Sequence, residues 1–219
     1  MMRWVYVCII SIVFIRLAVL PPPAGEAMQT GIAEMVVQEA HVPNSVAGIL
    51  LRNRLYDTIF EVFVFTLAVL GVQYALSLHT TEKDIFYMQD PSMVILARIA
   101  AMVSALIFLE LALRGHLAPG GGFAAGVAGG SAIGLVTLTG NVDSLYAFYQ
   151  RRHIATVEKF IVLLILGFGV AFLLYPDAQL LGRPISASAI IMLNILIAAK
   201  VAIGSWTIVL LFIRHRGLL

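Results

Sequence analysis

The sequence predicts an all-α integral membrane protein with about six transmembrane helices and no soluble domain. Of its 219 residues, 61% are hydrophobic and only 12% are charged, and the mean hydropathy is +0.98. Because soluble domains carry about 25% charged residues, this chain has too little charge to solvate a globular surface. Several apolar segments also reach the roughly 20 residues that a helix needs to cross a bilayer. The net charge of +2 gives no reason to expect nucleic-acid binding.

The first apolar segment covers about residues 2–20 and ends at three consecutive prolines. Its early arginine and apolar run have the character of a signal peptide, but Arg16 interrupts the run and the chain offers no plain small-x-small cleavage site. We therefore expect a retained span, with a cleaved signal peptide as the alternative. Residues 24–54 are more polar and end in a short helix expected on or in the membrane interface.

Five further spans are expected at about 55–78, 93–114, 122–140, 155–175 and 187–213. The connecting segments orient them, since lysine and arginine are enriched in cytoplasmic loops. Basic clusters at 150–153 and 214–216 lie beside spans on one side, whereas 21–45 on the other side holds three acids and no lysine or arginine. We therefore expect a multi-pass protein of the cell inner (cytoplasmic) membrane with both termini in the cytoplasm.

Ionisable residues stand at the start of the second span, where they are costly and usually functional or paired. Arg54, Asp57 and Glu61 are spaced i, i+3 and i+7, so a helix places them on one face. The arginine can neutralise one carboxylate, and the other must take up a proton or hold a cation. This pattern predicts a proton or sodium relay. The alternative is a structural Arg54–Asp57 pair with Glu61 facing another subunit.

Lys200 lies near the middle of the last span, in the stretch NILIAAKVAIGSW. At that depth a lysine needs a carboxylate, a water-filled cavity or a lowered pKa. We expect it on or beside an ion path, with a structural pair to a neighbouring chain as the alternative. Glu158 and Lys159 are adjacent, so they point in different directions. Both are expected close to the inner surface, where side chains reach water at little cost.

Glu110 and Arg114 are spaced i, i+4 at the outer end of the third span, so simple pairing is the first explanation. His116 follows two residues later, at the start of a glycine-rich segment. Glu110 and His116 are therefore further candidates for the ion path. The chain offers neither the His-x-x-x-His nor the Cys-x-x-Cys spacing that a metal site would favour.

The glycine-rich segment, RGHLAPGGGFAAGVAGGSAIG at 114–134, is not a nucleotide-binding loop. A phosphate-binding loop needs Gly-Lys-Ser/Thr, and here Phe123 follows the glycines. The dinucleotide pattern fails because Gly126 comes one residue late. In a membrane protein, Pro119 and the three glycines that follow it end one span and turn the chain into the next. Unpaired amides at this turn could face an ion or a water-filled cavity.

Beyond the turn, glycines recur every four residues, at Gly122, Gly126, Gly130 and Gly134. On a helix this spacing makes a smooth ridge, against which another helix can pack closely.

The stretch RGHLAPGGGF (114–123) is similar to a signature of the MnhB/MrpB-type subunit of Mrp-type multisubunit Na⁺/H⁺ antiporters, a module also present in membrane-bound hydrogenases and related complexes of the complex I superfamily. The resemblance implies a four-span region over 93–219. The residues assigned to its structural motif are Arg114, Pro119, Gly120, Gly121, Gly122, Phe123, Gly126 and Gly130. Of these, the resemblance also associates Pro119 and Phe123 with function.

The stretch VPNSVAGILLRNRLYDTIFEV (42–62) resembles the C-terminal part of the A-type antiporter subunit and the separate E-type subunit of membrane-bound hydrogenases. The matching positions are Asn44, Arg54, Tyr56, Asp57, Thr58 and Glu61. Ile59-Phe60 replaces the usual Leu-Gly, a departure that leaves the carboxylate pair intact. We therefore expect a two-span region at 1–79 and an inner loop at 80–92 before the four-span region.

The resemblance implies a membrane subunit of a cation (Na⁺)/H⁺ antiporter without a cofactor, a metal site or catalytic chemistry of its own. Its expected partners are antiporter-like subunits of the A and D types, a small C-type subunit, Na⁺, H⁺ and the lipid bilayer. The ion-path candidates are Asp57, Glu61, Lys200, Glu110 and His116. The alternatives are a membrane-arm subunit of a redox-driven complex and a purely structural scaffold.

Overall fold

The computed structural model describes residues 31–78, 90–174, 179–180 and 183–216. The chain divides into two units, residues 1–35 and 36–219. Only the start of helix α2 (Ile32–Ala40) represents the first unit among the described residues, and everything below concerns the second. The span predicted at 2–20 and most of the loop predicted at 80–92 lie outside the described residues.

Five helices of the described part are long and apolar enough to cross a membrane. They are α4 (Leu55–Ser77), α5 (Pro91–Arg114), α6 (Gly121–Thr139), α8 (Ile154–Leu174) and α9 (Ile185–Arg216). Each agrees within a few residues with a span predicted from the sequence. The agreement follows from the long apolar runs, and at α5 a polar cap also marks the start of the helix. Asp90, for example, accepts a hydrogen bond from the Ser92 amide at 2.9 Å, just before α5 begins.

Shorter elements connect the spans. The short helix predicted before Arg54 is confirmed as α3 (Ser45–Gly48), which continues into a π-helical segment, η1 (Ile49–Asn53). A two-residue antiparallel pair, β1 (Gln179–Leu180) and β2 (Arg183–Pro184), precedes α9.

Helix α7 (Val142–Arg151) was not predicted. Its buried side includes Val142 and Tyr149, spaced i, i+7. The Tyr149 hydroxyl lies 3.1 Å from that of Thr207 on α9, and burial raises the pKa of the tyrosine. The phenol therefore stays neutral and hydrogen-bonded.

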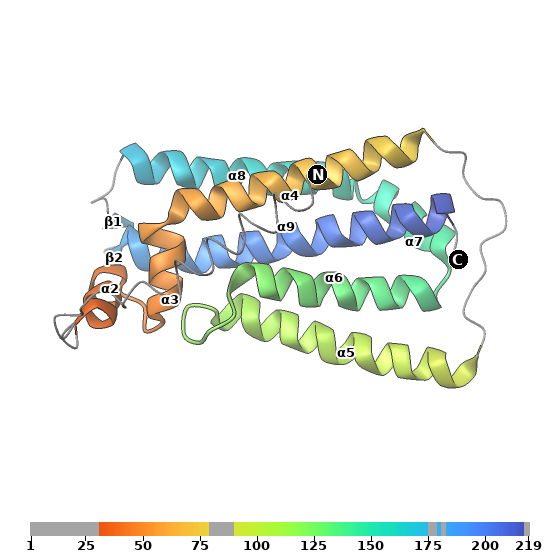
Figure 1. Cartoon of the computed structure of the whole chain (residues 1–219), viewed down its shortest axis with the longest axis horizontal. Coiled ribbons are helices and arrows are strands. Elements are labelled where there is room, and N and C mark those ends of the chain that lie inside the picture. The colour runs from red at the N-terminus through yellow and green to blue at the C-terminus, as the bar shows by residue number, and fades with distance from the viewer. Residues whose placement is uncertain (1–30, 79–89, 175–178, 181–182, 217–219) are drawn as a thin grey trace, which may run out of the picture. The chain divides into compact units, whose positions relative to one another are not determined.

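Helix α9 is the centre of the bundle (Figure 1). It contacts α4 and α8 on one side and α6 on the other, and α5 packs mainly on α6. In the most apolar stretch of α9, half of the residues are buried, whereas only 6% are buried in the corresponding stretch of α5. The peripheral helices therefore present apolar surface that lipid or other subunits must cover.

The glycine ridge of α6 is confirmed. Its members face α9: Gly122, Gly126, Gly130 and Gly134. A Cβ at Gly122 would lie 2.6 Å from the main-chain oxygen of Asn194, and one at Gly126 would overlap Val201. On another side of the helix, a Cβ at Gly129 would lie 2.7 Å from the ring of Phe108 on α5. Small residues thus let α6 approach both of its neighbours closely.

Candidate functional site

The most deeply buried charge pair in the described residues joins α9 to α8. Lys200 Nζ lies 2.6 Å from Glu158 Oε1, and the two side chains are 0% and 9% exposed. Lys200 follows the first residue of α9 by fifteen positions, near the middle of the helix. The lysine therefore has the carboxylate that its depth in the membrane requires, and the carboxylate belongs to the same chain.

The third helix around this pair is α4. The Lys200 ammonium lies 4.8 Å from the centroid of the Phe65 ring, close enough for a cation–π interaction. The expectation that the Glu158 side chain reaches water is wrong, because packing of α8 against α9 encloses it. Lys159 does remain exposed, so the two neighbours point in different directions as predicted.

A cavity of about 350 Å³ lies beside the pair, between α4 and α8; we call it the α4–α8 cavity. Its polar lining consists of Thr66 and Gln73 on α4 and of Glu158 and Lys159 on α8. The Glu158 side chain thus both binds Lys200 and borders this cavity. An ion or a water molecule could reach the carboxylate without displacing a helix.

The carboxylates at the start of α4 lie in a different environment. Arg54 Nε donates to Asp57 Oδ2 at 2.7 Å, and both side chains are more than half exposed. Glu61 is also exposed, and no ion pair connects it to a residue that the structure describes. The spacing argument is therefore confirmed for the Arg54–Asp57 pair and leaves Glu61 as the unneutralised carboxylate.

Glu61 borders a second cavity, of about 170 Å³, which we call the turn cavity. It lies where α3, η1 and α4 meet the glycine turn and α9. Its lining residues are Asn44, Val46, Ala47, Leu50, Leu51, Thr58, Glu61, Gly115, Gly120, Gly121, Gly122, Phe123, Asn194 and Ile197. The two stretches that carried the family resemblance, 42–62 and 114–123, thus border one space.

Asn44 holds these two stretches together. Its Nδ2 donates to the carbonyls of Gly115 at 2.9 Å and Ala118 at 2.8 Å, and its Oδ1 accepts from the Val46 amide at 3.1 Å. The main-chain N–H of Asn44 also donates a hydrogen bond to the main-chain oxygen of His116, at 3.3 Å. The sequence identified Asn44 only as a matching position, and its bonding role requires the tertiary contact.

The glycine turn requires glycine at two positions. Gly120 has a φ of 150° and Gly121 a φ of 70°, values that residues with a side chain rarely adopt. Gly120 also provides no side-chain cap for α6.

Asn194 of α9 fixes the end of α5 beside this turn. Its Nδ2 donates to the carbonyls of Leu111 at 3.1 Å and Ala112 at 2.7 Å.

Of the remaining predicted residues, Glu110 and Arg114 are exposed near the end of α5, and the half-buried His116 lies in the turn that follows. Arg114 Nη1 binds Glu110 Oε1 at 2.9 Å, and both side chains are about 60% exposed, which confirms simple pairing. The ring of His116 makes no hydrogen bond to the described residues. The structure thus connects His116 to the site through its backbone and leaves Glu110 apart from Glu61 and Lys200.

Helix α4 carries both Glu61 and the ring that contacts the buried pair. Phe65, which covers Lys200, follows Glu61 by four residues on α4, a rise of about 6 Å. Ile197, which lines the turn cavity, precedes Lys200 by three residues on α9. The contact between α4 and α9 therefore leads from the turn cavity to the Lys200–Glu158 pair.

The fold is a multi-pass helical bundle with a glycine ridge, and charged groups lie inside its apolar packing. These features are typical of membrane subunits of ion-transporting complexes. The model of a protein family, described as a domain related to the MnhB subunit of Na⁺/H⁺ antiporter, matches residues 92–207, which is more than half of the chain. The chain belongs to this family, as the motif at 114–123 predicted.

The fold is also similar to that of a solved chain from the membrane-bound sulfane sulfur reductase (MBS), an archaeal respiratory membrane complex. The TM-score is 0.66 over 98% of this chain and 99% of the other, at 20% sequence identity. At this identity the likeness concerns the fold. Comparison with curated proteins gives no significant match.

Proposed function

We propose that this chain is a membrane subunit of a multisubunit cation (Na⁺)/H⁺ antiporter, and that it forms part of the ion path and packs neighbouring subunits together. The observation that carries the proposal is the Lys200–Glu158 pair, buried among three helices and bordered by a cavity. A buried pair alone is weak evidence for stabilisation, since apolar residues of similar size often do as well. The pair also borders the α4–α8 cavity, so ions in the cavity could bind its carboxylate.

In this mechanism, ions compete for the Glu158 carboxylate. A proton or a cation that enters the α4–α8 cavity and binds the carboxylate weakens the hold of Glu158 on the Lys200 ammonium. The freed ammonium then repels a second cation or passes a proton onward. Glu61, about 9 Å along α4 from the start of the helix, takes up the ion at the other end of the α4–α9 contact. Asp57 stays paired with Arg54 and sets the local charge.

The subunit supplies no catalytic chemistry and no cofactor in this account. Its partners are antiporter-like subunits of the A and D types and a small C-type subunit. The exposed apolar faces of α4 and α5 support contacts of this kind, because they include large residues such as Phe60, Val64, Ile95 and Leu106. Within residues 36–219, the bonds of Asn44 to the glycine turn connect the stretch 42–62 to the region that begins at 93.

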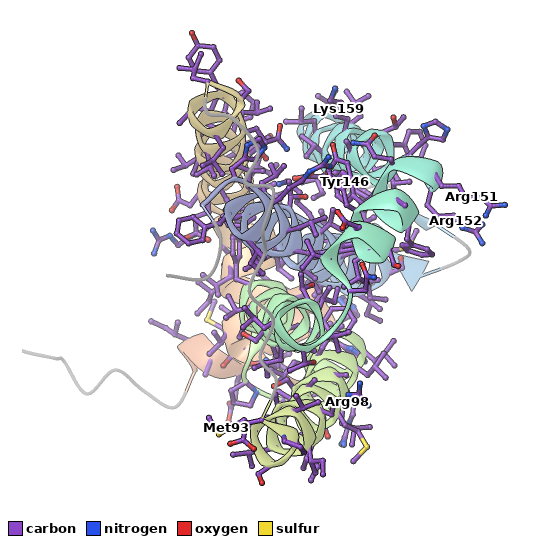
Figure 2. All side chains as sticks on the ribbon, turned by 90° about the vertical axis from the view of Figure 1, so that its right-hand side faces the viewer. Met93, Arg98, Tyr146, Arg151, Arg152 and Lys159 are labelled. Atoms are coloured by element: carbon purple, nitrogen blue, oxygen red, sulfur yellow. The ribbon has the colours of Figure 1, made fainter. Side chains whose placement is uncertain are left out.

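We place both termini in the cytoplasm, in the inner membrane. Arg151 and Arg152 project outward from the end of α7 (Figure 2). The guanidinium of Arg214, near the end of α9, lies 3.5 Å from the centroid of the Tyr146 ring on α7. The two basic clusters therefore gather at one end of the bundle, as the positive-inside rule requires of a cytoplasmic end.

A redox-driven complex is the second candidate, because the fold is shared with a subunit of a respiratory membrane complex. The identity of the co-purifying subunits decides between them. Antiporter-like subunits alone support the antiporter, whereas subunits that carry redox centres support the alternative, in which the same ion path is driven by electron transfer.

Replacing Glu61 with glutamine tests the ion-path role. The exchange of Na⁺ for H⁺ in membrane vesicles should fall to background while the full set of subunits still assembles. Glu39→Gln is the matched control, because Glu39 forms an exposed pair with Arg52 at 2.8 Å and lies outside the proposed path. Wild-type exchange in Glu61→Gln vesicles would leave only the scaffold role.

A further inference from the structure

The turn cavity combines hydrogen-bonding groups that the protein leaves unused. Asn194 is 1% exposed, and its Oδ1 has no hydrogen-bond partner among the described residues. The orientation of its amide is fixed, since Nδ2 donates to two carbonyls that accept only from a donor. A buried acceptor without a partner is costly, because it has given up its hydrogen bonds to water. Asn194 lines the turn cavity, so this cavity is the space from which a donor would approach its oxygen.

Donors without acceptors lie in the same cavity. Gly121 and Gly122 begin α6 and line the cavity, and the first amides of a helix have no partner within the helix. Gly120 precedes them without a side chain that could accept their hydrogen bonds. A Cβ built on Gly121 would lie 4.0 Å from Asn194 Oδ1, so the start of the helix and this oxygen are close neighbours.

An unpaired acceptor beside unpaired donors indicates which kind of ligand the cavity would bind. A cation would suit the Asn194 oxygen and the Glu61 carboxylate but not the amides at the positive end of α6, and an anion would suit the amides but neither the oxygen nor the carboxylate. Water satisfies both groups, because it accepts from an amide and donates to a carbonyl oxygen. A volume of about 170 Å³ has room for roughly five water molecules at their liquid density.

We propose that the turn cavity holds bound water, and that this water joins Asn194 and the first amides of α6 to the Glu61 carboxylate as a route for protons. Protonation of Glu61 forms one O–H bond at the carboxylate and breaks one at the neighbouring water, which regains a proton from the next water along the chain. Asn194 is a positioning residue, since it holds the water and does not exchange the proton itself. The route rests on the proposed role of Glu61 in exchange, whereas the hydration of the cavity does not.

X-ray radiolytic hydroxyl labelling of the assembled complex tests the hydration, since radicals form from water bound beside a side chain. Phe123 lines the cavity, whereas Phe108 packs against Gly129 between α5 and α6, and both rings are partly buried. Phe123 should be labelled several-fold more than Phe108. Equal labelling of the two rings would overturn the proposal.

Two variants test the proton route. Asn194→Leu removes the acceptor together with the two hydrogen bonds that Nδ2 donates to α5, whereas Ala47→Leu fills the cavity from α3 without removing a side-chain hydrogen bond. Each should reduce the labelling of Phe123 to the level of Phe108, slow exchange several-fold and increase the slowing of exchange in D2O. If Ala47→Leu dries the cavity but leaves the rate and its D2O effect unchanged, the route is refuted. If Glu61→Gln also leaves exchange intact, the proposed function fails separately, while strong Phe123 labelling in the wild type still supports a hydrated cavity.

Discussion

Removing the carboxylate from the buried pair is the perturbation with the largest expected effect. Glu158→Gln keeps the size of the side chain but leaves the Lys200 ammonium, which is fully buried, without a countercharge. Breaking a buried pair in this way costs about 3–5 kcal/mol. The ring of Phe65 retains up to about 2 kcal/mol of favourable interaction with the ammonium, so we expect the lower end of that range.

The assay is thermal unfolding of the purified complex. A loss of about 3 kcal/mol corresponds to a drop of roughly 6–12 °C in Tm for a domain of this size. The double variant Glu158→Leu/Lys200→Met removes both charges and should return Tm close to the wild-type value, since apolar replacement of a whole pair is often neutral or stabilising. Glu39→Gln, in the exposed pair with Arg52, should cost no more than about 1 kcal/mol.

Two results would refute the reasoning. A wild-type Tm for Glu158→Gln would mean that the ammonium is not desolvated by the three helices. A double variant as unstable as the single one would mean that packing, and not an uncompensated charge, causes the loss.

Two further predictions concern the packing of the glycine segment. Gly126→Ala should reduce assembly of the complex, because a Cβ there overlaps Val201. Gly167→Ala should assemble normally, because among the described residues a Cβ at that position meets no packed neighbour within 4 Å. Quantitative native gels compare the two variants. Asn44→Ala should lower the unfolding free energy by about 1–3 kcal/mol, since the carbonyls of Gly115 and Ala118 lose their partner; a Tm equal to that of the wild type would show that these carbonyls are not held by Asn44.

Much of the fold follows from the sequence because its signals are local. Apolar length marks each of the five described spans, and a spacing of four residues places the glycines on one helix face. The Arg54–Asp57 and Glu110–Arg114 pairs follow from helical spacing alone. Features of this kind need no knowledge of which helices pack together.

The candidate site was only partly predictable, since its contacts join distant segments. Lys200 requires a carboxylate, but hydropathy does not say that α8 packs beside α9 and brings Glu158, 42 residues away in sequence, to the lysine. Glu158 is four residues into α8 and is the only acid of that helix, and matching it to the one lysine in the last span would have suggested the pair. The hydrogen bonds of Asn194 to α5 could not be predicted, because they depend on the tertiary contact of α9 with the turn around Gly115.

The central claim is that the Lys200–Glu158 pair takes part in ion transfer and does not merely hold helices together. The most direct measurement is Na⁺-driven proton movement in liposomes that contain the complex with the Glu158→Leu/Lys200→Met double variant, whose stability should match that of the wild type. The account predicts a fully assembled complex without exchange. Exchange at the wild-type rate from that complex would contradict it.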